Sequence, residues 1–338
     1  MKVCLVGAGA IGGLLAVKLA FAGNAVSVID RGPHLAAIRN KGLHLHWQDG
    51  TIWKANVKGF ESAADAGEQD LVVLAVKAYD LERVAEDIED LLGAETIVMT
   101  VQNGIPWWYF QKEGGRFDGK RLQTLDPNGT LSKNVHPDRI IGCVAYPAAA
   151  LAAPGIVQHV EGERFPLGEL DGRETERVKM ISDALIKSGL KSRVLTDIRA
   201  EIWLKAWGSL TFNPISALGR ATMAGICRFP ETRKLAVGMM TEAQSIASKL
   251  GITFRHTIEQ RLEGAEKVGE HKTSMLQDLE AGKPLENEAL IGAILEMGRL
   301  TDTSTPVIEA VYALVKLLDN VTRATSAEGV GAAATIAA

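Results

Sequence analysis

The sequence contains few cysteines, and their arrangement excludes two kinds of site. Only three of the 338 residues are cysteine, namely Cys4, Cys143 and Cys227. They are far apart and odd in number, without the paired spacing of a zinc site or of a disulfide framework. We therefore expect no structural zinc and no disulfide scaffold, and a reducing compartment fits this composition.

A basic excess and a long apolar run are also missing. The net charge is -4, whereas nucleic-acid-binding proteins usually carry a clustered basic excess. No apolar run approaches the roughly 20 residues that span a bilayer. The apolar stretch that follows Lys2 is interrupted at once by glycines, unlike a signal peptide. We expect no nucleic-acid partner, no membrane partner and a cytoplasmic location.

What the chain does contain is the composition of a globular protein of two domains. Hydrophobic residues make up 46% and charged residues 23%, and the length exceeds that of one ordinary core. The first third alternates short apolar runs with helical patterns, which is typical of βαβ units and a parallel sheet. The run at 70–76 is apolar almost throughout and should be a central strand. The other expected elements are strands at 2–6, 25–29 and 96–101 and helices at 10–22 and 81–92.

Later segments differ in character. Residues 107–137 are irregular, and we interpret them as an excursion or lid. Strand-like sequence resumes at 140–146 and 156–159, and long helical patterns then run from 196 to about 323. We expect one domain at 1–195, a second at 196–323, and a tail at 324–338 with a frayed end.

A glycine loop stands between the first strand and the first helix. Gly7, Gly9 and Gly12 form a G-x-G-x-x-G pattern, completed at its variable positions by Ala10 and Ile11. The first glycine permits a tight turn, the second lets the backbone approach a diphosphate, and the third lets helix and strand pack closely. The free N–H groups at the helix start then face the phosphates. We expect a dinucleotide site, although such a loop can also be an ordinary glycine-rich turn.

Asp30 and Arg31 follow the second strand, where the adenosine ribose of a dinucleotide is normally bound. A carboxylate there accepts a hydrogen bond from the ribose 2′-hydroxyl, whereas a guanidinium pairs with a 2′-phosphate. The pair therefore leaves both NADP and NAD open, and Arg31 can equally be a solvated loop residue. The fold class that follows is α/β, with an N-terminal Rossmann doubly wound sheet and a second, all-helical C-terminal domain.

Two polar residues end strands at the same expected edge of the sheet. Lys77 closes the buried strand, and Asn103 follows the strand at 96–101. Ligands bind at this edge in open α/β folds. Asn103 can also be a turn residue before Gly104, and Lys77 an ordinary exposed lysine.

A lysine interrupts an apolar helix face in the second half. Ile198, Ile202, Lys205, Ser209 and Asn213 recur at helical spacing and share one face. An amine in this position could act as a proton donor. Alternatively, the lysine side chain could extend so that its ammonium group lies in water.

These segments together resemble the ketopantoate reductase (2-dehydropantoate 2-reductase) family over nearly the whole chain. The likeness rests on GAGAIGG at 7–13, DRG at 30–32, Lys77, QNG at 102–104, the Lys205 helix, and the stretch from Thr273 to Asp278 followed by Glu286. It implies NADPH-dependent reduction of a 2-keto acid to a 2-hydroxy acid, a step of pantothenate biosynthesis.

The resemblance also implies roles for individual residues. Lys205 is the general acid, Glu286 binds substrate, and Ser274 helps to hold the substrate carboxylate. Asn103 positions the lysine or the nicotinamide, and Lys77 lies near the cofactor. Ser209 and Asn213 are expected on the substrate side. Without the resemblance Glu286 would be one of several acidic residues on a solvated helix face.

One position departs from the family pattern. Ser209 stands where the catalytic helix usually carries an asparagine, and its single hydroxyl puts the substrate in question. Two alternatives stay open: a related reductase of another 2-keto acid that uses NAD or NADP, and a non-catalytic nucleotide-sensing protein. The subunit number is open as well, with a homodimer as one option.

His44 and His46 form an H-x-H without further ligands nearby, so we expect no metal.

Overall fold

The computed structural model describes the backbone of residues 1–336 and the side chains of residues 1–324. The chain divides into two compact units, the first from Met1 to Glu201 and the second from Ile202 onward. The division lies inside helix α7 (Ile198–Gly219) rather than at residue 195. The first turn of α7 belongs to unit 1 because Ile198 packs closely against the glycines of two strands, Gly142 and Gly168.

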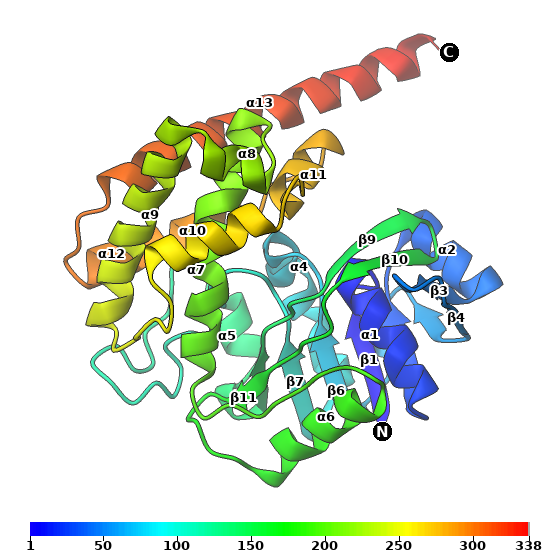
Figure 1. Ribbon diagram of the computed structural model, residues 1–338. Helices are drawn as coiled ribbons and strands as arrows, with labels where there is room; N and C mark the ends of the chain where they lie inside the picture. The colour runs from blue at the N-terminus through cyan, green and yellow to red at the C-terminus, as the bar shows by residue number, and fades with distance from the viewer. Residues whose placement is uncertain (337–338) are drawn as a thin grey trace. The chain divides into compact units, whose positions relative to one another are not determined.

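Unit 1 is built on a seven-stranded sheet within the described residues, and β1 and β6 stand near its middle (Figure 1). The strands β1, β2, β5, β6, β7 and β8 are parallel, and β11 is antiparallel to β8. This confirms the predicted α/β class and the central position of the apolar run near 70–76. Across the sheet the order is β11 (Leu167–Glu169), β8 (Ile140–Cys143), β7 (Leu92–Thr100), β6 (Gln69–Leu74), β1 (Lys2–Val6), β2 (Ala25–Ile29), β5 (Lys58–Phe60).

The direction of winding reverses between β1 and β6. The chain moves from β1 to β2 in one direction and from β6 to β7 in the other. Because such crossovers are right-handed, α1 (Ala10–Phe21) and α4 (Leu81–Ala85) fall on opposite faces of the sheet. The carboxyl ends of β1 and β6 therefore flank a topological switch point, which is where open α/β sheets bind ligands.

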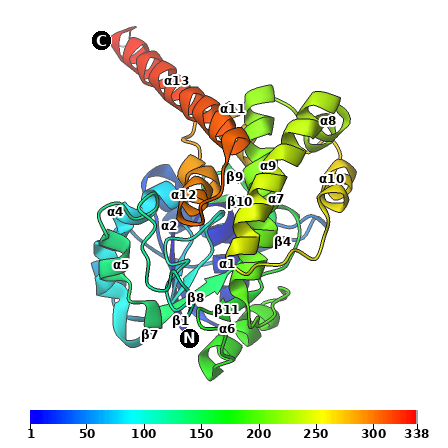
Figure 2. The same ribbon diagram turned by 90° about the vertical axis from the view of Figure 1, so that its left-hand side faces the viewer.

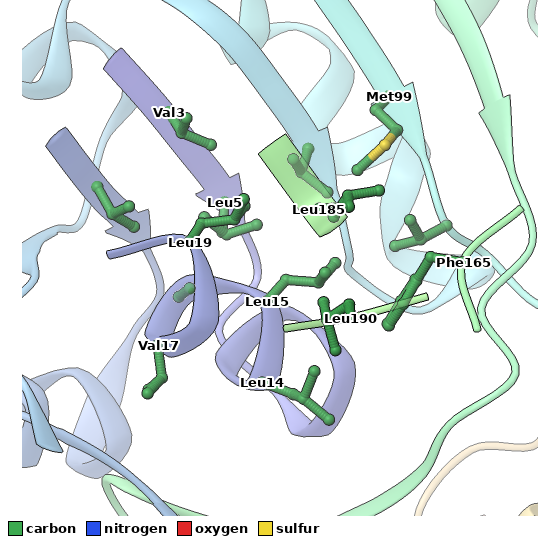
Figure 3. Packing of buried hydrophobic residues seen from close by; sticks show 14 of the residues in the cluster. Val3, Leu5, Leu14, Leu15, Val17, Leu19, Met99, Phe165, Leu185 and Leu190 are labelled. Carbon is green, nitrogen blue, oxygen red and sulfur yellow. The ribbon is translucent and has the colours of Figure 1, made fainter. Parts of the chain in front are cut away.

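Helix α1 is the centre of the unit 1 core. Apart from Lys18 it is apolar on all sides, as expected of a helix that is covered all round. Figure 3 shows Leu15 and Leu19 of α1 beside Leu5 of β1, with Leu185 of α6 (Glu176–Lys187) in the same cluster. On its other side α1 contacts a second sheet in the order β4 (Ile52–Ala55), β3 (Leu43–His46), β10 (Ile156–Glu161), β9 (Ala148–Ala153).

A lysine joins α1 to the second sheet. The Lys18 ammonium lies 4.1 Å from the ring centroid of Trp47 and 4.2 Å from that of Trp53. Trp47 in turn stacks on His159, with ring centroids 3.6 Å apart. On β3, His44 interacts with the Lys41 carbonyl oxygen, and residues 1–324 contain no group of three metal-ligating side chains.

Residues 107–137 are irregular, as predicted, but they are packed into the protein. The aromatic run Trp107, Trp108, Tyr109 and Phe110 is buried. Trp108 donates a hydrogen bond to Thr100, and Arg199 donates to the carbonyl oxygens of Tyr109 and Gln111. The segment is therefore anchored at its start and is not a free lid. Its helices are α5 (Thr130–Asn134) and a 3-10 turn at Pro137–Arg139.

The remaining short elements of unit 1 are helices that lie between strands in the order of the chain. They are α2 (Gly32–Lys41), α3 (Ala63–Ala66) and two 3-10 helices, Ala78–Asp80 and Asp87–Leu91.

Unit 2 is all-helical in the part that is described, as predicted. Trp207 is fully buried there, stacks on Phe254 and donates to the Met240 carbonyl oxygen. After α7 the helices are α8 (Met223–Arg228), α9 (Pro230–Lys249), α10 (Ile258–Lys267), α11 (Ser274–Glu280), a π-helix (Glu288–Gly292), α12 (Ala293–Leu300) and α13 (Pro306–Ile336).

Helix α13 is longer than predicted. Figure 2 shows it as one continuous helix, which takes in the expected tail as far as Ile336. The expectation of a frayed end from residue 324 was therefore wrong for the backbone through Ile336, because the alanine-rich tail has high helix propensity. Residues 337–338 lie outside the described part. Among the described helices none is both long and apolar enough to cross a membrane.

Candidate active site

The glycine loop occupies the carboxyl end of β1, at the switch point. Gly7 has φ +94°, and an added Cβ would lie 2.8 Å from Val76 Cγ1, next to the end of β6. A Cβ at Gly12 would lie 1.9 Å from the Gly7 carbonyl oxygen. Both positions therefore require glycine. Gly7 requires it for its backbone conformation and for close approach, and Gly12 requires it for close approach alone.

Gly9 differs from its two neighbours because it faces open space. It is the N-cap of α1 with φ -60°, and an added Cβ would meet no atom within 4 Å. Ala10, Ile11 and Gly12 form the first turn behind it, so the free N–H groups of the helix start face the same open side. This arrangement fits a diphosphate.

A cavity of about 240 Å³ begins at this loop. Gly7, Gly9, Asp30 and Arg31 line it, so four of the predicted cofactor residues meet at one place. Asp80 and Arg83, which follow β6, line it as well. Its size and its place beside β2 suit the adenosine end of a dinucleotide.

The two residues after β2 have different surroundings. One Asp30 carboxylate oxygen accepts from the Ala8 N–H at 2.8 Å, and the other accepts from the Arg31 N–H at 2.7 Å. The Arg31 side chain is 69% exposed and lies 3.8 Å from Asp80, which Arg83 also approaches at 3.5 Å. Asp30 thus supports the glycine loop directly, whereas Arg31 extends along the cavity.

Lys77 and Asn103 lie at the carboxyl ends of neighbouring parallel strands, as predicted. Lys77 is the N-cap of the 3-10 helix after β6, and Asn103 follows β7. The Oδ1 atom of Asn103 is buried without a hydrogen-bond partner in the described structure, and so is Oε1 of Gln102. Gln102 donates from Nε2 to the carbonyl oxygens of Leu74 and Val76. Buried amide oxygens without partners are acceptors for a ligand, so this edge also fits a cofactor.

In unit 2 the residues on the α7 face have the predicted helical arrangement. Lys205 and Ser209 are half-buried, and Asn213 is buried one turn beyond Ser209. The three polar groups follow each other along one side of a single helix. Pro214 lies inside the helix immediately afterwards.

Ser274 and Glu286 are in two further elements of unit 2. Ser274 begins α11 and is exposed, while Glu286 is buried and precedes the π-helix. Asp319 of α13 holds the chain on both sides of Glu286, because its carboxylate accepts from the Leu285 N–H at 3.1 Å and from the Asn287 side chain at 3.5 Å. The π-helix that follows is a rare form that often marks functional segments.

Comparison with known proteins covers both units of the chain. Residues 3–172 match the family model described as ketopantoate reductase PanE/ApbA, and residues 197–319 match its C-terminal counterpart. A protein named 2-dehydropantoate 2-reductase from Mesorhizobium japonicum is 50% identical over 94% of this chain and 98% of its own length. The chain belongs to the ketopantoate reductase family.

Solved structures of ketopantoate reductases have the same fold. A candidate ketopantoate reductase from Ralstonia solanacearum is 37% identical with a TM-score of 0.91, covering 95% of this chain and 98% of its own. A 2-dehydropantoate 2-reductase from Geobacter metallireducens is 28% identical with a TM-score of 0.82, covering 94% and 99%. This ketopantoate reductase family member is therefore an enzyme of the oxidoreductase class, and the resemblance inferred from its motifs is confirmed.

Sequence reasoning missed three residues that contact parts of the candidate site. His34 contacts the glycine loop, Gln102 ties β7 to the end of β6, and Asp319 holds the Glu286 segment. Gln102 could have been found from its place in the QNG segment. His34 and Asp319 stand in no motif, and their contacts join positions far apart in the sequence.

Proposed function

We propose that this protein reduces the ketone of 2-dehydropantoate to the hydroxyl group of pantoate, with NADPH as hydride donor. The observation that carries the proposal is the open Gly9 N-cap at the switch point of a ketopantoate reductase family member. Bound at this edge, the nicotinamide cofactor supplies the hydride that adds to the ketone carbon. The electron pair of the C=O π bond then passes to the oxygen.

The proposed roles of the protein side chains follow from the charge that develops on that oxygen. Lys205 donates its proton to the oxygen, which completes the hydroxyl group. Glu286 and Ser274 bind and orient the substrate, with Ser209 and Asn213 beside it on α7. Asn103 orients the reacting groups through its unpartnered amide oxygen, and Lys77 contributes to cofactor binding. The protein thus provides position and charge.

The test is the K205A variant, with K234A as a matched control on an exposed lysine of α9. We expect K205A to lower kcat by about 10²- to 10⁴-fold, the range typical of a lost general acid. The Kd for NADPH should stay close to that of the wild type, and K234A should behave as the wild type in both measurements. Wild-type turnover in K205A would remove the lysine from the mechanism.

The substrate is tested separately because of Ser209. A hydroxyl group offers fewer hydrogen bonds than the asparagine amide usual in the family, which favours a different 2-keto acid as the second candidate. A panel of 2-keto acids, followed by NADPH absorbance, should give the highest kcat/KM with 2-dehydropantoate. Binding of NADPH without its oxidation by any keto acid would instead support a nucleotide sensor.

For the cofactor we propose NADPH over NADH. The Arg31 guanidinium is exposed, lines the cavity and can pair with a 2′-phosphate, while both Asp30 oxygens accept backbone N–H groups. The R31Q variant should raise the KM for NADPH about tenfold and leave the KM for NADH nearly unchanged. The control is R39Q, in the helix α2 that begins after Arg31. An equal change for both cofactors would contradict the proposal.

We also propose a homodimer and a cytoplasmic location. Leu314, Leu317 and Val321 are exposed along α13 at spacings of three and four, which gives one apolar stripe. A second copy could cover it with the same stripe. No disulfide joins Cys4, Cys143 and Cys227, which agrees with a reducing compartment.

A further inference from the structure

His34 is a buried histidine between the glycine loop and a distant hairpin. It lies in the first turn of α2 and is only 8% exposed. Its Nε2 lies 2.9 Å from the Ala8 carbonyl oxygen, and its Nδ1 accepts from the Gly155 N–H at 2.9 Å. Because Nδ1 is the acceptor, Nε2 carries the hydrogen and donates it to Ala8.

The Ala8 carbonyl needs this partner. Ala8 is fully buried and precedes the N-cap, and the helix ladder begins one residue later with the bond from the Gly13 N–H to the Gly9 carbonyl oxygen. A buried carbonyl without a partner costs free energy comparable to a lost hydrogen bond. Gly13 leaves the room for this carbonyl, since a Cβ at position 13 would lie 2.8 Å from the Ala8 oxygen.

The geometry of the peptide group links the hydrogen bond at the Ala8 carbonyl to the direction of the Gly9 N–H. In a trans peptide the C=O and the following N–H point in opposite directions. Since the Ala8 C=O points inward to His34, the Gly9 N–H points away from His34, toward the open side of the loop. The Ala8 N–H is held separately by Asp30 at 2.8 Å, so side chains hold both polar groups of Ala8.

The second contact of His34 connects this loop to the β9–β10 turn. Gly155 has φ +77° and lies between β9 and β10, where an added Cβ would come within 3.1 Å of Ala37 of α2. Its carbonyl oxygen accepts from the His44 N–H of β3. His34 therefore joins the glycine loop of the large sheet to the turn of the small sheet.

We propose that His34 is a positioning residue for the dinucleotide: by holding the Ala8 carbonyl it keeps the Gly9 N–H directed at the cofactor diphosphate. This inference rests on the proposed function, because it needs the glycine loop to bind the cofactor. It assigns no chemical step to His34, which contacts the loop and not the reacting atoms.

Two variants separate the two contacts of the ring. In H34Q the side-chain amide can donate from the position of Nε2 and keep the Ala8 contact, while the Gly155 contact is lost. In H34N the side-chain oxygen can accept at the position of Nδ1 and keep the Gly155 contact, while the Ala8 contact is lost. Each variant loses one hydrogen bond, so a role in stability alone predicts similar behaviour for the two.

The measurements are the Kd for NADPH, kcat at saturating cofactor, and Tm. We expect H34N to raise the Kd at least tenfold with kcat near that of the wild type, and H34Q to stay within about threefold in both. Equal Kd changes in the two variants, or a wild-type Kd in H34N, would overturn the inference. If the wild type itself does not bind NADPH, the proposed function fails instead.

A measurement on the unmodified protein covers the case in which H34N does not fold. Nitrogen-15 NMR of the histidine rings reports which ring nitrogen carries the hydrogen. The inference requires the Nε2–H form of His34 at neutral pH, both without and with NADPH. Finding the Nδ1–H form would refute it.

Discussion

Gly9 and Gly12 lie in one loop, yet a methyl group would have different effects at the two positions. At Gly9 it would enter open space with an ordinary φ, whereas at Gly12 it would overlap the Gly7 carbonyl oxygen. The G9A variant should therefore keep the Tm of the wild type within about 2 °C and raise the Kd for NADPH at least tenfold, because the methyl group occupies the diphosphate position.

The G12A variant should instead change the stability of the fold. It should lower the Tm by several degrees, because the overlap with the Gly7 oxygen forces the start of α1 away from β1. Thermal unfolding and cofactor titration of both variants test the pair. A G12A protein with wild-type Tm and Kd would show that the close approach is not required.

Residues of the site differed in how far the sequence could predict them. Gly7, Gly9 and Gly12 were predictable because the motif is local and its spacing follows from one turn of chain. His34 was not, because its two partners lie 26 and 121 residues away in the sequence and become neighbours only in the folded chain. Gly9 and Gly12 also look alike in sequence, and only the contacts show their separate roles.

At the scale of elements, α13 supports the segment that carries Glu286. Asp319 accepts hydrogen bonds from the residues on both sides of Glu286. The D319A variant should raise the KM for the keto acid several-fold and leave the KM for NADPH unchanged. The loss of two hydrogen bonds should also lower stability by about 1–3 kcal/mol.

The matched control is N320A, which removes an exposed polar side chain from the same helix. Steady-state kinetics with each substrate varied in turn, together with urea unfolding, distinguishes the two effects. An unchanged KM for the keto acid in D319A would mean that Asp319 serves stability alone.

The free energy of unfolding should depend on pH through Lys18, which joins α1 to the second sheet. Burial lowers the pKa of Lys18 from its usual 10.5, although Glu163 and Asp49 favour its charged form. The unfolded chain therefore binds the proton more strongly than the folded chain. Between the lowered pKa and about 10.5, the free energy of unfolding should rise with pH as the buried amine becomes neutral.

The K18M variant lacks this titration and keeps most of the apolar volume. The stability of the wild type relative to K18M should increase as pH rises from 7 toward 10.5, measured by urea unfolding at each pH. A constant difference would show that the folded protein does not disfavour the charged amine.

The elements themselves were predictable where the pattern was strong. The apolar run near 70–76 indicated a central strand because only a strand covered on both faces is apolar throughout, and β6 has that place. β9 was missed because AAALAA has little strand propensity, and it becomes a strand only by pairing with β10. The tail was misjudged for a related reason, since its alanines favour helix without giving an apolar periodicity.

At the scale of the whole molecule, the exposed stripe of α13 makes the proposed homodimer testable. The side chains of Leu314, Leu317 and Val321 are each more than half exposed. The wild type should have twice the mass of the 36.2 kDa chain in light scattering, and L314K/L317K should have the mass of one chain. The control K316A leaves the stripe intact, and a monomeric wild type would contradict the proposal.

The division into two units was visible in the sequence as a change of pattern, but its place was not. The long helical patterns begin after Thr196, as expected for an all-helical half. The first turn of α7 nevertheless packs with unit 1, because Arg199 donates hydrogen bonds to the carbonyl oxygens of Tyr109, Gln111 and Leu170. These hydrogen bonds and the packing of Ile198 against Gly142 and Gly168 place the boundary at Glu201.

The burial of the three cysteines has a practical consequence. Burial raises the pKa of the Cys4 thiol to about 11 and also raises that of Cys227, so at neutral pH almost none of either is the reactive thiolate. Cys143 is buried too. A single cysteine introduced on the surface should therefore take a fluorescent label selectively in the native protein, without prior removal of the natural thiols.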